Sequence, residues 1–291
     1  MNKGSNRFNI RRMIQGVREV STIPDIYAKV NEVFNNPISS ASDLGRVISG
    51  DQGLTVRILR LVNSTFYGFP SKIDTVSRAL TIIGFKQVRE LVLATSILSM
   101  FKDLGDKISF KMEDFWKHSI GCGLTSRVLG IYRRRESPES YFVAGLLHDI
   151  GRLILLENYS EEYREVFTIV KDKNSLVFEA EMDVFGFTHA EVAKELISSW
   201  NLPDSLKVAV GYHHEPQGGK GSSSYADIVH ISDILVHACG IGYSGEQFVP
   251  PLNTDAWERV GLKKGILGPA FEKIFEQFED TYSFFVGAGE R

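Results

Sequence analysis

The sequence predicts an all-α protein, because apolar residues recur three and four positions apart along most of the chain. That spacing places them on one face of a helix, whereas a strand would alternate apolar and polar residues. No pair of segments shows the alternation expected of two neighbouring strands. The chain has 291 residues, 43% of them hydrophobic and 24% charged, which is an ordinary globular balance and a length that suits two cores.

The first part of the chain is predicted to form one compact bundle of five short helices. The first helix ends before Pro37, since residues just before a proline rarely continue a helix. Ser42 or Asp43 can cap the second helix, and Gly50 can close it. The five predicted helices cover residues 24–34, 43–50, 54–62, 80–83 and 85–101.

A polar break over residues 102–109 is the predicted domain boundary, which gives domains over residues 1–107 and 108–291. Longer helices are predicted in the second domain, and a Gly- and Ser-rich stretch over residues 217–224 is predicted to be a loop. The predicted longer helices cover residues 112–132, 138–158, 160–172, 175–185, 189–200, 204–215, 225–239 and 268–285.

All seven histidines lie between residues 118 and 237, and five of them are candidate metal ligands together with two aspartates. The adjacent His148 and Asp149 can offer a nitrogen and an oxygen to the same ion. Asp233 lies in an apolar run, where a carboxylate is costly to bury unless it meets a cation. His230 and His237, on the helix face of Asp233, are interpreted as ordinary residues. The candidate ligands are His118, His148, Asp149, His189, His213, His214 and Asp233.

A mixture of imidazole and carboxylate suits iron, manganese, nickel or zinc. We expect one or two divalent ions per chain, iron or manganese first and nickel or zinc as alternatives. Arg152, one turn after His148, is predicted to contact phosphate oxygens, so Asp149 and Arg152 are the candidate catalytic residues. Cys122 and Cys239 form no CxxC pair, so neither a thiolate metal site nor a disulfide framework is predicted.

The order of these residues resembles the H…HD…D signature of the HD superfamily of metal-dependent phosphohydrolases, with His189 and the paired histidines where HD-GYP enzymes have further ligands. The first half of the chain looks more narrowly like an HDOD domain, the HD-related output domain of bacterial signalling proteins. The loop after the paired histidines reads EPQGGKGSSS and lacks the GYP sequence. The HDOD resemblance rests on LGRVI at 44–48, DQGL at 51–54, LRLVNS at 59–64, Ala79-Leu80, Ile83-Gly84 and HAEVAKELISSWNLP at 189–203.

The resemblance implies an N-terminal bundle of short helices packed on an HD-type helical domain, and it leaves two functions open. The first is a bacterial signalling or regulatory output protein that holds metal or a phosphorylated ligand without turnover. The second is an active phosphohydrolase or phosphodiesterase acting on a nucleotide or cyclic nucleotide. In the second case, Asp149 would connect a metal ion at the H…HD…D residues to another at His189 and His213 or His214.

Net charge and hydropathy limit the classes of partner that we expect. A net charge of −3 gives no indication of a nucleic-acid or membrane-surface protein. The basic N-terminus has no apolar segment behind it, and the longest apolar stretch, residues 91–101, is too short to span a bilayer. We therefore expect a cytoplasmic protein whose partners are a signalling protein and a phosphorylated small molecule or nucleotide.

Overall fold

The computed structural model describes residues 8–16, 22–101, 111–134, 137–216 and 224–286, and every regular element in these ranges is a helix. The all-α prediction is confirmed. Contacts group the chain into two compact units, one of Met1–Thr22 with Asp103–Leu267 and one of Ile23–Lys102 with Gly268–Arg291. The predicted boundary after residue 107 lies outside the described residues, and the C-terminal helix, predicted to belong to the second domain, groups with the first bundle instead.

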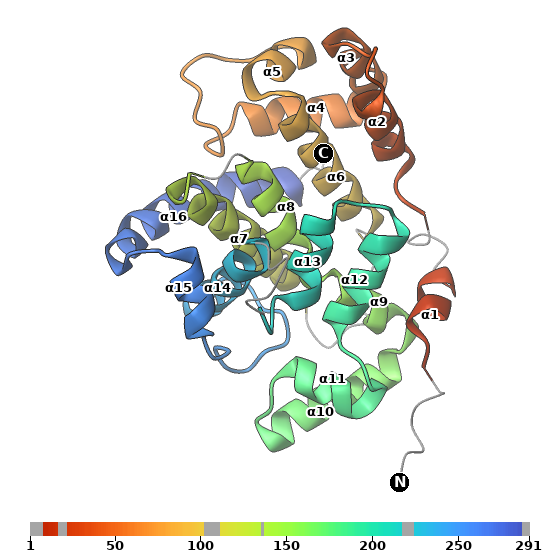
Figure 1. Ribbon diagram of the computed structural model, residues 1–291, viewed down its shortest axis with the longest axis vertical. Helices are drawn as coiled ribbons and strands as arrows, with labels where there is room; N and C mark the ends of the chain where they lie inside the picture. Colours follow the sequence, from red (N-terminus) through yellow and green to blue (C-terminus); the bar gives the residue numbers. More distant parts are fainter. Residues whose placement is uncertain (1–7, 17–21, 102–110, 135–136, 217–223, 287–291) are drawn as a thin grey trace. The chain divides into compact units, whose positions relative to one another are not determined.

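The unit that begins at Ile23 contains five short helices and the C-terminal helix, and α6 packs against α2, α4 and α5 (Figure 1). The cap of α3 is Ser40 and differs from the predicted Ser42 or Asp43, because Ser40 and Asp43 exchange hydrogen bonds in a capping box. Gln277 ties the C-terminal helix to this unit by donating to the Thr65 carbonyl at 2.9 Å. The helices are α2 (Asp25–Asn35), α3 (Ala41–Ser49), α4 (Gln52–Val62), α5 (Val76–Ile83), α6 (Phe85–Met100) and α16 (Leu267–Phe285).

The other unit is built around α7, which lies against α8 and α14 (Figure 1). Most residues of α7 are buried, so this helix forms the centre of the unit. The sequence did not predict α1, α15 or the short 3₁₀ helix η1 (Lys264–Ile266). The α-helices are α1 (Ile10–Gly16), α7 (Met112–Tyr132), α8 (Pro138–Leu147), α9 (Ile150–Asn158), α10 (Ser160–Lys173), α11 (Val177–Phe185), α12 (His189–Ser199), α13 (Asp204–Tyr212), α14 (Ser224–Ala238) and α15 (Thr254–Val260).

Two predicted helices of this unit are wrong in ways that shape the site. The helix predicted over 138–158 is broken at His148 and Asp149, where a turn separates α8 from α9. Periodicity could not show this break, because both segments are buried on nearly all sides. The helix predicted over 204–215 ends at Tyr212, so His213 and His214 lie in the turn before Pro216. In both places a turn, rather than a helix, presents the candidate ligands.

Two glycines beside the broken helix allow unusually close helix packing. A Cβ atom on Gly145 would lie 2.5 Å from the Cys122 carbonyl oxygen on α7. A Cβ atom on Gly151 would overlap the His189 carbonyl oxygen on α12. Only glycine fits at such approaches of one backbone to another. The two glycines therefore allow α7 and α12 to approach the turn that carries His148 and Asp149.

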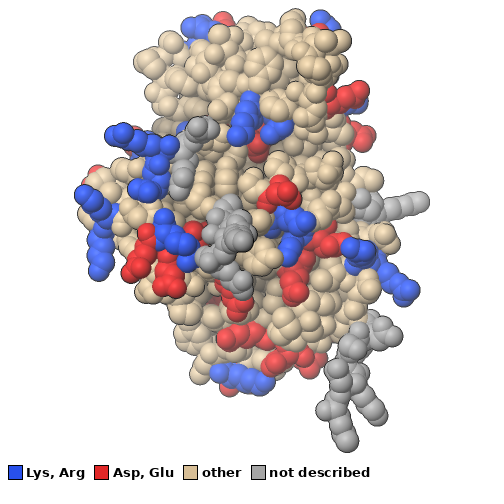
Figure 2. Space-filling model, in the orientation of Figure 1, with Lys and Arg blue, Asp and Glu red and all other residues tan. Residues whose placement is uncertain are grey.

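Two surface properties bear on the class of protein. In the part of the chain that the structure describes, no helix combines the length and apolar character of a membrane span. On the face drawn in Figure 2, lysine and arginine side chains are interspersed with aspartate and glutamate, and the coloured residues form no broad patch of one sign. That face therefore lacks the broad basic surface typical of nucleic-acid binding.

Candidate metal centre

The first group of donor atoms comes from α7, the α8–α9 turn and α14. His118 Nε2 lies 3.1 Å from Asp233 Oδ1, and His148 Nε2 lies 3.6 Å from the same oxygen. Asp149 Oδ2 faces this group, 3.5 Å from His148 Nε2 and 4.0 Å from His118 Nε2. All four side chains are buried. We call His118, His148, Asp233 and the Oδ2 side of Asp149 the first donor set.

The second group lies on the other side of the same carboxylate. Asp149 Oδ1 is 3.0 Å from His189 Nε2 and 3.6 Å from His213 Nε2. His214 Nε2 lies 2.9 Å from His189 Nε2, so three imidazoles converge here. We call His189, His213, His214 and the Oδ1 side of Asp149 the second donor set. The structure thus brings all of the predicted ligand residues together, with Asp149 between the two sets.

Several of these atoms are buried without the hydrogen bonds that buried polar atoms normally make. Among the described residues, neither carboxylate oxygen of Asp149 accepts a hydrogen bond of good geometry, and Nε2 of His148 makes none, although ion-pair partners lie 3.0–3.6 Å from these atoms. A buried polar atom without a partner costs about 1–3 kcal/mol, and more when it is charged. The donor atoms form two groups, and within each group all of them lie within 4.8 Å of one another. One group is His118, Cys122, His148 and Asp233, and the other is Asp149, His189, His213 and His214. Unpartnered nitrogen and oxygen atoms at this spacing fit a divalent cation at each group.

In three of the histidines, a hydrogen bond at the other ring nitrogen, Nδ1, orients the ring. Nδ1 of His148 donates to the Gly145 carbonyl at 2.7 Å, and Nδ1 of His213 donates to the Val210 carbonyl at 2.8 Å. Nδ1 of His189 lies 2.6 Å from Glu181 Oε2. Each bond fixes the ring, and in the neutral ring a proton on Nδ1 leaves the Nε2 lone pair available, which is how metal-binding histidines are usually held.

Burial and nearby charges shift the pKa values of these residues. Against the effect of burial, the Asp149 carboxylate raises the pKa of His148 and the Glu181 carboxylate raises that of His189. Burial lowers the pKa of His118 and of His213 to about 4, so both imidazoles are neutral near pH 7. Burial by itself would raise the pKa of Asp149, but the Arg152 guanidinium and the neighbouring histidines hold it well below its ordinary value. Asp233 is likewise held well below its ordinary pKa by His237 and His118, against the opposing effect of burial. Neutral imidazoles and ionised carboxylates are the forms that bind metal.

Arg152 lies in the interior with 1% of its surface exposed. Its guanidinium donates to the Ser244 carbonyl and lies 3.4 Å from Glu246 Oε1, while its Nε is 3.2 Å from Asp149 Oδ1. A contact of Arg152 with phosphate was expected from the sequence, whereas in the structure its guanidinium contacts the Asp149 carboxylate. The observed position fits a residue that holds and orients the carboxylate.

Sequence reasoning missed four residues around the centre. Glu181 orients His189 and accepts from the Tyr163 hydroxyl at 2.5 Å, and Glu246 pairs with Arg152. His237 Nε2 lies 3.2 Å from Asp233 Oδ1, one helical turn away, although it was interpreted as an ordinary residue. The spacing of His237 from Asp233 was a usable signal. Glu181, Glu246 and Cys122 could be recognised only from the fold.

Changing Glu181 to glutamine is expected to weaken the second donor set selectively. The glutamine amide carries no negative charge to support the His189 ring, so metal affinity there should fall about 10- to 100-fold, the usual effect of losing such a partner. The first donor set should keep its affinity. Isothermal titration of the chelator-treated protein with Zn²⁺ resolves the two events, and Glu165→Gln, at an exposed position of α10, is the matched control. An unchanged affinity at the second donor set in the Glu181 variant would contradict this role.

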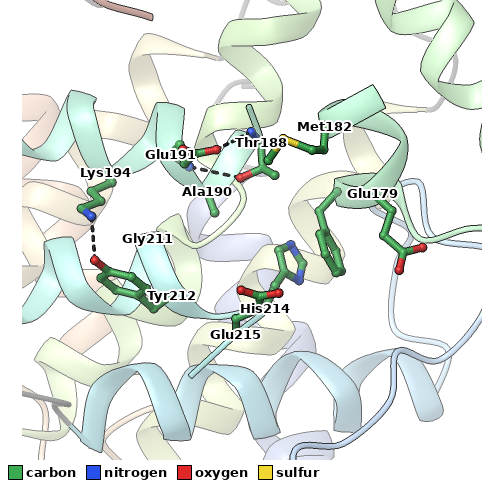
Figure 3. Close-up of a pocket in the computed structure, with 11 residues that line it drawn as sticks. Glu179, Met182, Thr188, Ala190, Glu191, Lys194, Gly211, Tyr212, His214 and Glu215 are labelled. Carbon is green, nitrogen blue, oxygen red and sulfur yellow. Dashed lines mark hydrogen bonds between the residues drawn. The ribbon is translucent and has the colours of Figure 1, made fainter. Parts of the chain in front are cut away.

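An open pocket adjoins the second donor set. It has a volume of about 610 Å³ and is lined by residues of α11, α12 and the end of α13 (Figure 3). His214 belongs both to this lining and to the second donor set. On one side of the pocket, Lys194 donates to the Tyr212 hydroxyl at 2.8 Å (Figure 3). A small molecule in this pocket would meet the donor set through His214.

Comparisons with solved structures agree with the helical fold. An HDOD domain protein of unknown function from Geobacter sulfurreducens is 24% identical and superposes with a TM-score of 0.78, covering 94% of this chain and 96% of its own. A protein from Shewanella amazonensis named "Putative phosphohydrolase" is 21% identical with a TM-score of 0.73, covering 94% of this chain and 97% of its own. At these identities the likeness shows a shared fold.

Two curated relatives are longer proteins that match this chain over part of their length. An uncharacterized protein of Treponema pallidum is 22% identical over 202 residues, which make up 68% of this chain and 38% of that protein. The protein YuxH of Bacillus subtilis is 25% identical over 144 residues, which make up 48% of this chain and 32% of that protein. The chain therefore spans well under half the length of these relatives.

An all-helical core that gathers histidines and aspartates from separate helices defines the class of HD-related proteins. The HDOD domain family matches residues 20–216 of the chain, which is more than half of its length. The chain belongs to the HDOD domain family, as its sequence resemblance indicated.

Proposed function

We propose that the chain is a signalling output protein whose HDOD core binds two divalent metal ions and, beside them, a phosphorylated small molecule. The observation that carries the proposal is the surroundings of the Asp149 carboxylate. Its two buried oxygens lack hydrogen bonds, and each faces a separate group of histidine nitrogens. A buried carboxylate whose two oxygens make no hydrogen bond of good geometry, and that faces histidine nitrogens on both sides, would hold a cation on each side.

The residues of the two donor sets would hold the ions, and Arg152 and Glu181 would position them. Bound divalent ions supply positive charge for phosphate oxygens and lower the pKa of water. The pocket beside His214 gives such a phosphate a route to the second donor set. Its size suits a ligand of ordinary small-molecule dimensions, since such pockets run about 300–1,000 Å³.

The second candidate function is hydrolysis of a phosphodiester, and the position of Asp149 between two donor sets next to an open pocket favours it. Sites with two metals commonly catalyse phosphoryl transfer to water. In that case the two donor sets, with Asp149 between them, would hold the ions, while the Arg152 guanidinium would keep the Asp149 carboxylate ionised. The signalling and hydrolytic proposals share the metal centre and differ only in turnover.

One paired experiment separates these functions. Metal content of the purified full chain is measured by mass spectrometry of the elements, and turnover is measured with bis-p-nitrophenyl phosphate and with cyclic dinucleotides. Bound metal without turnover supports the output protein. Turnover that disappears in Asp149→Ala supports the hydrolase. Protein that takes up no Fe²⁺, Mn²⁺ or Zn²⁺ under any condition contradicts both.

A further inference from the structure

Cys122 lies in α7 one helical turn after His118, and its side chain has no exposed surface. Residues four apart on a helix point the same way, so the thiol faces the first donor set. Its Sγ is 3.5 Å from His118 Nε2 and 3.9 Å from Asp233 Oδ1. The sulfur is therefore within the same cluster of donor atoms as His118, His148 and Asp233.

The spacing of these atoms fits ligation of one ion. Bond lengths of about 2.0–2.3 Å to a four- or five-coordinate zinc ion place neighbouring ligand atoms roughly 3–4 Å apart. Within the cluster, His118 Nε2 lies 3.5 Å from the sulfur and 3.1 Å from Asp233 Oδ1, and His148 Nε2 lies 3.6 Å from that oxygen. A second observation is independent of the sulfur, since the buried Nε2 of His148 has no hydrogen-bond partner.

We propose that the Cys122 thiolate is a further ligand of the first metal ion, in addition to His118, His148, Asp233 and the Oδ2 side of Asp149, and that it makes the first donor set selective for zinc over manganese. This inference rests on the proposed metal-binding function. Thiolate is a soft ligand that favours zinc, whereas sites of carboxylate and imidazole alone also suit manganese. On binding, the sulfur lone pair forms the bond to the ion and the thiol proton passes to solvent, with no change of oxidation state.

The competing arrangement is an ordinary buried thiol that donates a weak hydrogen bond to Asp233. Burial and the nearby carboxylates raise the pKa of Cys122 well above its ordinary value, so the neutral thiol is its state without a cation. A coordinating thiol is deprotonated by the ion itself. The two arrangements therefore differ in whether sulfur bonds to the bound metal.

Cobalt(II) titration of the chelator-treated full chain distinguishes them. The protein carries Cys239→Ser, so that Cys122 is its only sulfhydryl; Cys239 is exposed, outside both donor sets. We expect a near-ultraviolet sulfur-to-cobalt charge-transfer band that appears with the visible cobalt bands and saturates when the first donor set is filled. The band should be absent in Cys122→Ser and in Cys122→Ala made in the same background.

Competition with zinc and manganese measures the selectivity. Both Cys122 variants are expected to lose about tenfold or more in Zn²⁺ affinity at the first donor set, with Mn²⁺ affinity changed by less than about threefold. Visible cobalt bands without the charge-transfer band would overturn the role of Cys122 and leave the metal centre standing. Absence of all cobalt bands would overturn the metal centre and this inference with it. The titration of the Cys122-containing protein needs no variant at the site, so it decides even if a Cys122 variant fails to fold.

Discussion

Replacing Asp149 by asparagine is expected to abolish metal binding at both donor sets. Asparagine keeps the shape of the side chain but removes the charge, and its amide nitrogen cannot bind a cation. Because the two carboxylate oxygens face different histidine groups, one substitution should affect two ions. The affinity of each should fall by about a hundredfold or more, beyond the range of about 10- to 100-fold for partners that only orient ligands. Isothermal titration of the chelator-treated protein with Zn²⁺ measures both events.

The matched control for this substitution is Asp183→Asn, at an exposed position of α11. Its metal content should equal that of the unchanged protein, and circular dichroism should show that both variants remain helical. A folded Asp149→Asn protein that keeps one ion at full affinity would show that the carboxylate serves one donor set only. Retention of both ions would remove Asp149 from the centre.

Replacing Gly151 by alanine is expected to cost the fold about 3 kcal/mol, at the upper end of the range for overpacking. The added methyl group would meet the His189 carbonyl oxygen and the Ala193 nitrogen, and these backbone atoms of α12 cannot rotate away. Moving α12 would also carry His189 away from Asp149. Urea unfolding should therefore show the loss of stability, and zinc titration should show weaker binding at the second donor set.

Gly268→Ala provides the comparison, because a methyl group there would meet no other atom within 4 Å among the described residues. That change should leave the free energy of unfolding within about 1 kcal/mol, with any gain coming from the better helix propensity of alanine. If Gly151→Ala were as stable as Gly268→Ala and bound zinc equally well, the close approach of α9 and α12 would have no part in forming the site.

Much of the fold could be predicted from helical spacing. The bounds of α7 match the prediction of 112–132, because polar residues at its start and charged residues after its end mark both termini. The break between α8 and α9 could not be predicted, because helices buried on nearly all sides carry no amphipathic pattern. Grouping of the C-terminal helix with the first bundle also depends on contacts between residues far apart in sequence, such as Gln277 with Thr65.

The candidate site was predictable in its members and partly predictable in its arrangement. Residue contexts and the family resemblance together predicted the seven candidate ligands, and all of them lie in the two donor sets, although metal binding by them stays a prediction. The resemblance also implied that Asp149 connects the two groups, whereas no spacing in the sequence could show that Arg152 contacts Asp149 instead of a phosphate. Cys122 was not predicted as a ligand, because it has no CxxC partner and two of its three neighbours in the cluster come from the α8–α9 turn and α14.

The most direct test of the central claim is anomalous X-ray diffraction from crystals of the full chain grown with Zn²⁺, collected on both sides of the zinc absorption edge. Two anomalous peaks are expected, one on each side of the Asp149 carboxylate. One should lie among His118, Cys122, His148 and Asp233, and the other among His189, His213 and His214. Well-ordered density for these side chains with no anomalous peak beside Asp149 would contradict the account.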